Sequence, residues 1–383
     1  MSKLSDLVVI DIGSKSICAY NAECLSDDNF AVKNFYEIEY SGYMDGSWVA
    51  PEEVLPSIVK LIDKIERTSG RIKKVYVGIP SQFAIVRTVY EKRTFPKKKR
   101  LTTTDIDDLF NENDPFLGSA YTRIHAEAVY YINDRGERVL SPVGKETSVL
   151  KTQLAYVGAK TELITHIRQG LLRYGVKSVD FIQSEYAAAL TLFSREERDN
   201  GVILADIGYL STSVLYVGGD ALLELKDFSL GGSMIALGIS TTMNIPYNVA
   251  AAIASKINLA YREEGDYSLK YDAKTYTYPI EQINKIAKEC ISCVVNYIKK
   301  AINSFRFDTS LDQTIFLTGG GFSEIRFARE YISKCFGREV EVVQPSMPNY
   351  DKPCYSTMVG LLKKAMIMEK QEKFGFLKRL FRL

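Results

Sequence analysis

Two stretches of sequence decide the fold: Leu7-Val8-Val9-Ile10-Asp11-Ile12-Gly13 and Val202-Ile203-Leu204-Ala205-Asp206-Ile207-Gly208. Each is an apolar run of strand length that ends in Asp-Ile-Gly. The glycine allows the next turn to approach a phosphate closely, and the backbone N–H groups of such a turn can face an anion. One copy is as typical of a simple strand end as of a binding site. Two copies about half a chain apart predict a duplicated architecture.

The residues around these stretches favour an α/β layered fold. A helical pattern covers residues 52–67, a strand pattern covers 75–80, and a second helical pattern covers 161–174. The segment 81–159 differs, with strand patterns at 84–94, 126–132 and 149–157 and a helical pattern at 104–113. We expect it to form a small insert within a first lobe. A third glycine cluster, Gly319-Gly320-Gly321, follows a strand pattern at 313–317.

The composition narrows the classes of protein. With 383 residues the chain is long for one core, so two lobes are expected. Its 46% hydrophobic and 25% charged residues are typical of a folded globular protein. A net charge of +2 argues against a general nucleic-acid-binding protein. There is no signal-peptide pattern and no apolar run near the ~18 residues of a spanning helix, so we expect a cytoplasmic protein.

The cysteines do not indicate a metal site. Cys290 and Cys293 form a Cys-x-x-Cys, but a helical pattern covers this segment, 283–302. A zinc site needs two more ligands, and neither His125 nor His166 has ligand-like spacing around it. We interpret the six cysteines as structural thiols.

The glycine turns resemble the nucleotide site of the actin, Hsp70 and sugar-kinase superfamily. Asp11-Ile12-Gly13-Ser14-Lys15-Ser16 is similar to the first phosphate loop, Asp206-Ile207-Gly208 to the start of the second, and Leu317-Thr318-Gly319-Gly320-Gly321 to the adenosine loop. The resemblance implies an ATP site formed by Asp11, Gly13, Ser14, Lys15, Ser16, Asp206, Gly208, Ser211, Gly319, Gly320 and Gly321. Asp11 and Asp206 would hold Mg²⁺ through water. Glu185, in Glu185-Tyr186-Ala187-Ala188-Ala189, would orient the attacking water in catalysis.

Within that superfamily the chain resembles the bacterial cell-division family FtsA. The stretches Tyr131-Ile132-Asn133-Asp134-Arg135-Gly136 and Ser141-Pro142-Val143-Gly144 are similar to the FtsA subdomain inserted in the first lobe. The resemblance implies an actin-like two-lobed α/β ATPase fold with an FtsA-type insert and a C-terminal amphipathic helix. It divides the chain into 1–80 and 161–199 (first lobe), 81–160 (insert), 200–232 and 311–368 (second lobe), 233–310 (smaller subdomain of the second lobe) and 369–383 (linker and amphipathic helix).

The departures from the FtsA pattern concentrate at the nucleotide. The second loop continues as Tyr209-Leu210-Ser211-Thr212-Ser213, where the family has two glycines and, later, an aspartate. In the first loop Lys15 stands where a small residue is usual, and Ser16 where a lysine is expected. The helical segment 249–256, which normally brings a carboxylate toward the adenosine, has none. These changes argue against meaningful hydrolysis and leave open whether ATP is bound.

The last eleven residues form the clearest amphipathic pattern in the chain. At 100° per residue, one half of the helical wheel carries Phe374, Phe376, Leu377, Leu380, Phe381 and Leu383, and the other half carries Lys378, Arg379 and Arg382. This segregation is typical of a helix lying in the interface of an anionic membrane, and it outweighs docking on the protein's own core. The polar residues 369–373 are expected to separate it from the preceding helix. Lys97-Lys98-Lys99-Arg100 is expected in a solvated loop, with a second lipid contact as the alternative.

The function implied by the FtsA resemblance is that of an adaptor in cell division. Such a protein would polymerise on the cytoplasmic face of the membrane at the division site and bind the tubulin homologue FtsZ through 233–310. A second hypothesis is a scaffold ATPase of pilus assembly related to PilM, which shares the insert but does not carry its own lipid-binding helix. A third is a small-molecule kinase, against which Tyr209 and Leu210 argue because a kinase needs an intact phosphate clamp.

Overall fold

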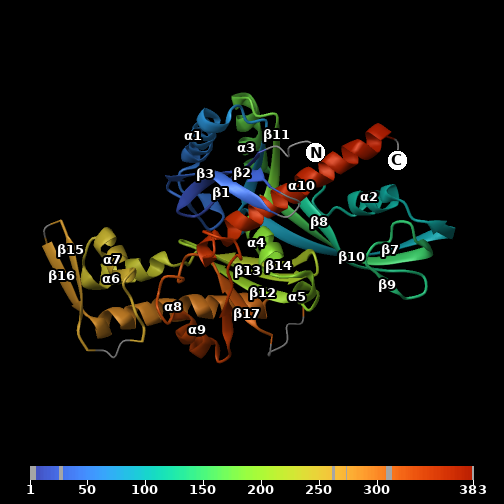
Figure 1. Ribbon diagram of the computed structural model, residues 1–383. Helices are drawn as coiled ribbons and strands as arrows, with labels where there is room; N and C mark the ends of the chain where they lie inside the picture. Colours follow the sequence, from blue (N-terminus) through green and yellow to red (C-terminus); the bar gives the residue numbers. More distant parts are fainter. Residues whose placement is uncertain (1–5, 26–28, 261–263, 273, 308–312, 382–383) are drawn as a thin grey trace.

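The computed structural model describes residues 6–25, 29–260, 264–272, 274–307 and 313–381, and it gives side chains as far as residue 372. Two α/β lobes lie one above the other in Figure 1, and a separate β-sheet projects from the upper lobe to the right. The long last helix crosses the upper lobe and ends on the same side as that sheet.

Each lobe is built on a five-stranded sheet. The first contains β1 (Leu7–Ile12), β2 (Ser16–Cys24), β3 (Phe30–Glu39), β6 (Lys74–Ile79) and β11 (Ser178–Gln183) in the order β11-β6-β1-β2-β3. The second contains β12 (Val202–Ile207), β13 (Thr212–Gly218), β14 (Ala221–Phe228), β17 (Ile315–Thr318) and β18 (Val340–Val342) in the order β14-β13-β12-β17-β18. In both, the strand with Asp-Ile-Gly pairs antiparallel with the next strand and parallel with a later one. The predicted duplication is therefore confirmed.

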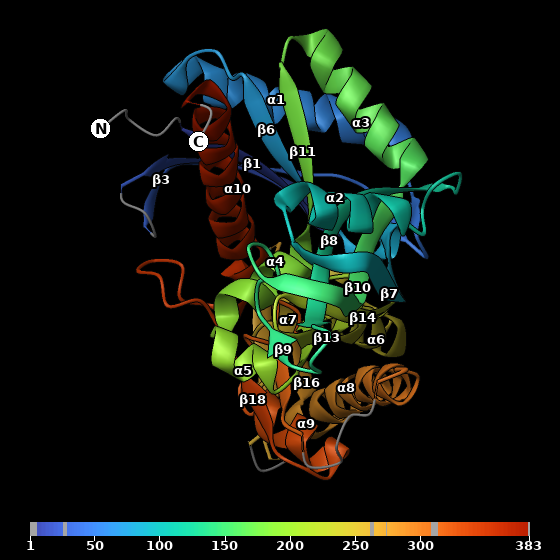
Figure 2. The same ribbon diagram turned by 90° about the vertical axis from the view of Figure 1, so that its right-hand side faces the viewer.

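Helices cover these sheets and fill the space between them. In the first lobe α1 (Pro51–Ser69) and α3 (Thr161–Tyr174) bury their apolar faces on one side of the sheet. The second lobe carries α6 (Ser233–Met243), α7 (Tyr247–Ala254), α8 (Ile280–Asn303) and α9 (Ala328–Phe336). Two helices, α4 (Ser184–Leu192) and α10 (Ser356–Phe381), pack against each other, as Figure 2 shows at the centre. The remaining elements are α5 (Arg195–Asp199), the 3-10 turns η1 (Ser81–Phe83) and η2 (Pro353–Tyr355), and the hairpins β4 (Tyr43–Met44)/β5 (Ser47–Trp48) and β15 (Asp266–Tyr271)/β16 (Lys274–Pro279).

The segment between η1 and α3 forms the projecting sheet. Its strands are β7 (Ala84–Arg100), β8 (Tyr121–Ile132), β9 (Arg138–Val139) and β10 (Glu146–Lys160) in the order β7-β10-β8-β9, and α2 (Thr103–Glu112) covers one face. The strands are longer than the sequence patterns predicted. The expectation of a loop at Lys97-Lys98-Lys99-Arg100 is wrong, because these residues end strand β7 and Lys99 and Arg100 pair with Thr147 and Glu146 of β10.

The last helix is continuous from Ser356 to Phe381, so the prediction of a linker at 369–373 is wrong. The polar residues of this stretch are anchors instead. Tyr76 donates a 2.8 Å hydrogen bond to Glu369 Oε1, and Lys74 Nζ lies 3.4 Å from the same atom and 2.6 Å from Glu372 Oε1. Lys74 also lies 3.0 Å from Asp180 Oδ2 of β11. One lysine thus connects the first sheet to α10 just before the amphipathic segment.

None of the helices in the described residues is long and apolar enough to cross a bilayer. The side chains of 373–383, which carry the predicted amphipathic pattern, lie outside the described side chains. Their amphipathic arrangement therefore stays a prediction, as do the subdomain boundaries.

We expect Lys74→Met to lower the free energy of unfolding by about 2–3 kcal/mol, because it leaves Asp180 and Glu369 without their cation in a partly buried site. Urea denaturation measures the change. Lys73→Met is the matched control, since Lys73 is exposed and makes no ion pair among the described residues. Equal stabilities of the two variants would contradict this role of Lys74.

Candidate nucleotide site

The ends of β1, β12 and β17 meet at a cavity of about 400 Å³ between the two lobes. Its lining includes Glu185 and ten of the eleven residues predicted to bind ATP: Asp11, Gly13, Ser14, Lys15, Ser16, Asp206, Gly208, Ser211, Gly319 and Gly320. The eleventh, Gly321, lines a neighbouring cavity instead. Residues from three distant parts of the sequence therefore come together as predicted, while their role in binding stays a prediction.

The two Asp-Ile-Gly turns have the same geometry. Gly13 N donates to Ser16 O and Gly208 N donates to Ser211 O, each at 2.9 Å. The third turn requires glycine for a steric reason. Gly319 has a φ of +89°, and a Cβ at this position would lie 2.3 Å from Asp206 Oδ1. The adenosine-like loop can thus lie directly on the carboxylate of the second phosphate-like loop only because Gly319 has no side chain.

Three buried carboxyl groups, those of Asp11, Glu185 and Asp206, line the cavity and repel one another electrostatically when charged. Burial raises the pKa of Asp206 to about 8, and the negative charges of Glu185 and Asp11 add to this shift. Burial also raises the pKa of Asp11 to about 6, although Thr357 donates a 3.1 Å hydrogen bond to Asp11 Oδ2 that acts in the opposite direction. Burial likewise raises the pKa of Glu185. Such a group would be stabilised by a divalent cation, which lowers the cost of ionising neighbouring carboxylates.

Within the described ranges, no group of three or more His, Cys, Asp or Glu side chains is arranged to hold a metal ion. The assignment of Asp11 and Asp206 to a Mg²⁺ ion held through water stays a prediction.

Glu185 is held by donors on both of its oxygens. Ser213 Oγ donates to Oε1 at 3.1 Å, Ser81 N donates to the same oxygen at 3.4 Å, and Gln183 Nε2 donates to Oε2. In the sequence, Ser213 was notable only because it stands where the FtsA family has an aspartate. The structure gives it a second role, because a hydroxyl can donate to Glu185 where an aspartate would repel it. The carboxylate that would orient a water already has protein partners.

The second phosphate-like turn is also occupied by protein contacts. Leu210 N donates to Ser14 Oγ of the first turn at 3.0 Å, so this N–H is not directed at a ligand. The Tyr209 and Tyr247 hydroxyls are hydrogen-bonded at 2.6 Å, which connects the turn to α7. Lys15 Nζ lies 3.1 Å from Glu39 Oε1 and 5.6 Å from the centre of the Tyr209 ring. At the positions that depart from the FtsA pattern, a backbone N–H (Leu210) and a cation (Lys15) therefore interact with other parts of the protein and do not face the cavity as free phosphate ligands.

A neighbouring cavity of about 340 Å³ corresponds to the expected adenosine side. Its lining includes Gly321, Tyr209 and, from α7, Ala251 and Ala254. Helix α7 carries no carboxylate. Lys256, which follows it, donates to Ser268 O at 3.3 Å and does not line the cavity. The sequence reasoning missed Glu324, an exposed carboxylate that lines this cavity from the loop after Gly321. The only feature of the sequence that could have pointed to Glu324 is its position three residues after the glycine cluster.

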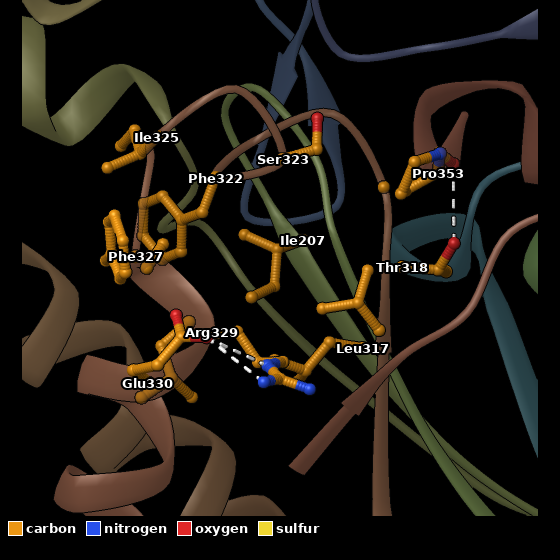
Figure 3. Close-up of a pocket in the computed structure, with 14 residues that line it drawn as sticks. Ile207, Leu317, Thr318, Phe322, Ser323, Ile325, Phe327, Arg329, Glu330 and Pro353 are labelled. Carbon is orange, nitrogen blue, oxygen red and sulfur yellow. Dashed lines mark hydrogen bonds and ion pairs between the residues drawn. The ribbon is translucent and has the colours of Figure 1, made fainter. Parts of the chain in front are cut away.

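A third, smaller cavity of about 130 Å³ lies behind the glycine loop (Figure 3). Ile207, Leu317 and Phe322 line it with apolar side chains, and Thr318 donates a 3.3 Å hydrogen bond to Pro353 O at its edge. We interpret this cavity as a packing feature of the glycine loop. Its walls are the strands and turns that hold Gly319 against Asp206.

Comparisons with known proteins show which sequences and folds this chain is similar to. No protein-family model matches the chain. FtsA of Pseudomonas aeruginosa is 23% identical over 93% of this chain and 88% of its own length. FtsA of Bacillus subtilis is 22% identical over 94% of this chain and 83% of its own length, and FtsA of Escherichia coli is 20% identical over 93% and 89%. The chain resembles FtsA.

Solved structures extend the likeness of this FtsA-like chain to the fold. PilM, in a PilM–PilN complex of type IV pilus biogenesis, superposes with a TM-score of 0.65 at 16% identity, covering 95% of this chain and 99% of PilM. MreB5 of Spiroplasma citri bound to ADP gives a TM-score of 0.56 at 11% identity, covering 96% and 98%. The predicted actin-like fold is confirmed, and an ADP complex is known for a protein that shares it.

We expect the contribution of Asp206 to the stability of the protein to fall as the pH rises from about 4 to about 8. In this window the folded chain keeps a proton on Asp206 that the unfolded chain releases, so deprotonation favours unfolding. Asp206→Asn should therefore have a higher free energy of unfolding than the parent protein at pH 8, by on the order of 5 kcal/mol, with a correspondingly higher melting temperature, and differ little at pH 4. Calorimetric melting at both pH values measures this. A pH-independent difference would contradict the burial of the Asp206 charge.

Restoring the family glycines should strengthen nucleotide binding. Tyr209→Gly with Leu210→Gly removes the contacts with Tyr247 and Lys15 and gives the turn the freedom to face a phosphate. Titration calorimetry with ATP and Mg²⁺ should show at least roughly tenfold tighter binding than the parent protein. Tyr247→Phe, which removes only the hydroxyl contact, should change little. Submicromolar ATP binding by the parent protein would contradict the interpretation that contacts within the protein compete with the nucleotide.

Proposed function

We propose that this chain is an FtsA-like adaptor in bacterial cell division. It binds the cytoplasmic face of the cell membrane at the division site, assembles into actin-like filaments, and attaches filaments of an FtsZ-like tubulin homologue to the membrane. The observation that carries this proposal is the similarity to cell-division FtsA proteins of several bacteria over 93–94% of the chain.

The membrane contact is assigned to the C-terminal segment Lys373-Phe374-Gly375-Phe376-Leu377-Lys378-Arg379-Leu380-Phe381-Arg382-Leu383. An apolar half-wheel opposite three cations fits the interface of anionic lipids. The position of α10 supports this, because its end extends away from the first sheet on the right of Figure 1. A segment of eleven residues binds a membrane weakly alone, so assembly of several copies would strengthen attachment.

The same proposal assigns little or no ATP hydrolysis to the chain. Leu210 N, Lys15 and both oxygens of Glu185 have protein partners. ATP with Mg²⁺ would have to displace these contacts to bind in the usual way. Binding of the tubulin homologue is assigned to residues 233–310, on the resemblance to FtsA alone.

A second candidate function is a PilM-like scaffold of pilus assembly. The observation that favours it is the superposition on PilM over 95% of this chain with a TM-score of 0.65. The two functions differ in the tail, since a PilM-like protein would bind a membrane partner and would not depend on residues 373–383 for lipid binding.

Deleting residues 373–383 should abolish co-sedimentation with vesicles of phosphatidylglycerol and phosphatidylcholine. Leu377→Glu with Phe381→Glu keeps the length and should have the same effect, because the apolar face is lost. An FtsZ-like protein should sediment with such vesicles only when the intact chain is present. Unchanged sedimentation of the deleted protein would exclude the tether and favour the PilM-like function.

A further inference from the structure

The outer end of the projecting sheet carries a second surface with interfacial chemistry. We call it the insert tip and define it as residues 95–100 at the end of β7 together with the loop 140–145 between β9 and β10. The FtsA-like function as proposed above assigns no role to it.

The backbone holds these two segments together. Leu101 N donates to Lys145 O at 2.9 Å and Gly144 N donates to Leu101 O at 2.8 Å, which fixes the loop beside the end of β7. In β7 itself, four residues (95–98) stand opposite the single residue Ser148, because Thr94 pairs with Val149 and Lys99 with Thr147. This bulge leaves Lys97 and Lys98 without strand partners on β10.

The charges of the tip are only partly balanced. Lys99 forms a 2.7 Å ion pair with Asp105 and Lys98 a 3.5 Å ion pair with Asp134. Lys97 and Arg100 are exposed and have no ion pair among the described residues, and Lys145 is exposed beside them. The tip therefore presents a surplus of positive charge to solvent.

Large apolar side chains stand exposed among these cations. Leu140 is 85% exposed and Val143 is 43% exposed, both in the loop next to Lys145. Lysine and proline on an edge strand also prevent edge-to-edge pairing, and β7 is an edge strand with Pro96 in its bulge. Prevention of edge-to-edge pairing does not explain why Leu140 and Val143 are exposed in the neighbouring loop. Exposed apolar residues surrounded by cations are instead the composition of a protein surface that enters the interface of an anionic membrane.

The position of the tip fits such a contact. Figure 1 shows the outer end of β7 and β10 and the C-terminal end of α10 projecting to the same side of the molecule, and Figure 2 looks onto that side. We propose that the insert tip is a second membrane contact, in which Lys97, Arg100 and Lys145 bind anionic headgroups while Leu140 and Val143 enter the interface. The proposal rests on the membrane attachment in the proposed function and adds a second point to it.

The test is vesicle binding by the full chain. Lys97→Gln with Arg100→Gln should weaken binding to phosphatidylglycerol-containing vesicles by roughly 10- to 30-fold, and binding to phosphatidylcholine vesicles should be unchanged. The matched control, Lys270→Gln with Lys274→Gln, changes the same charge on the β15/β16 hairpin at the opposite end of the molecule and should bind like the parent protein.

A second measurement reports insertion directly. Leu140→Trp should shift its fluorescence to the blue and be quenched by brominated lipid when anionic vesicles are added. Leu237→Trp, at a site on α6 that is 58% exposed, should not respond. Circular dichroism and melting temperature establish that each variant is folded.

The outcomes separate this proposal from the proposed function. Parent-like vesicle binding by Lys97→Gln/Arg100→Gln, or an unresponsive Leu140→Trp, overturns the insert tip as a membrane contact, even where the tail deletion abolishes binding. Loss of binding in the tip variant with no effect of the tail deletion supports the tip and overturns the tail tether. If the tip variant binds vesicles normally but no longer binds an acidic protein such as the FtsZ-like partner, the tip is a protein-binding surface and the lipid proposal is wrong.

Discussion

The structure depends on the close approach of glycine turns around the carboxylate of Asp206. A Cβ on Gly319 would lie 2.3 Å from Asp206 Oδ1, and a Cβ on Gly232 would lie 2.2 Å from Gly321 O. Backbone hydrogen bonds connect the same turns, from Gly321 N to Ile207 O at 2.7 Å and from Gly232 N to Gly208 O at 2.9 Å. Any side chain at these glycines would separate the strands that end there. These turns all belong to the second lobe, and the 3.0 Å hydrogen bond from Leu210 N to Ser14 Oγ connects them to the first lobe.

This arrangement has consequences for the energy of the site. Carboxyl groups buried near each other favour protonation or a bound cation, and the protein compensates in part with its own donors: Thr357 for Asp11, and Ser213, Ser81 and Gln183 for Glu185. Tyr209, Leu210 and Lys15 similarly take partners within the chain. The site is thus largely satisfied without a nucleotide. The hydrogen bond from Leu210 N to Ser14 Oγ connects the two Asp-Ile-Gly turns to each other without a nucleotide between them.

The sequence predicted the parts of the fold that depend on local patterns. The two Asp-Ile-Gly runs gave the duplicated sheets, and periodicity gave α3 with the same bounds, residues 161–174. It failed where distant residues decide. Residues 97–100 were predicted to form a loop because the strand partners of Lys99 and Arg100 on β10 lie about fifty residues away. Residues 369–373 read as a linker because Lys74 and Tyr76, which bind Glu369, come from β6. At the site, the sequence named the residues at the cavity but not their partners Thr357 and Ser81.

The continuous last helix changes how a membrane contact at its end would act. A flexible linker would leave the body free to rotate above the membrane, whereas a helix anchored at Glu369 and Glu372 by Lys74 has a defined direction relative to the first sheet. A second contact at the insert tip, fixed to the same lobe through the hydrogen bonds of β7 and β10, would then bind as part of one rigid unit. Two weak contacts on a rigid body raise each other's effective concentration at the surface. They also restrict the body to one orientation, and a common orientation of neighbouring subunits is what side-by-side assembly on a flat surface requires. In the proposed arrangement the membrane would do more than retain the protein, because it would align copies for polymerisation without energy from ATP.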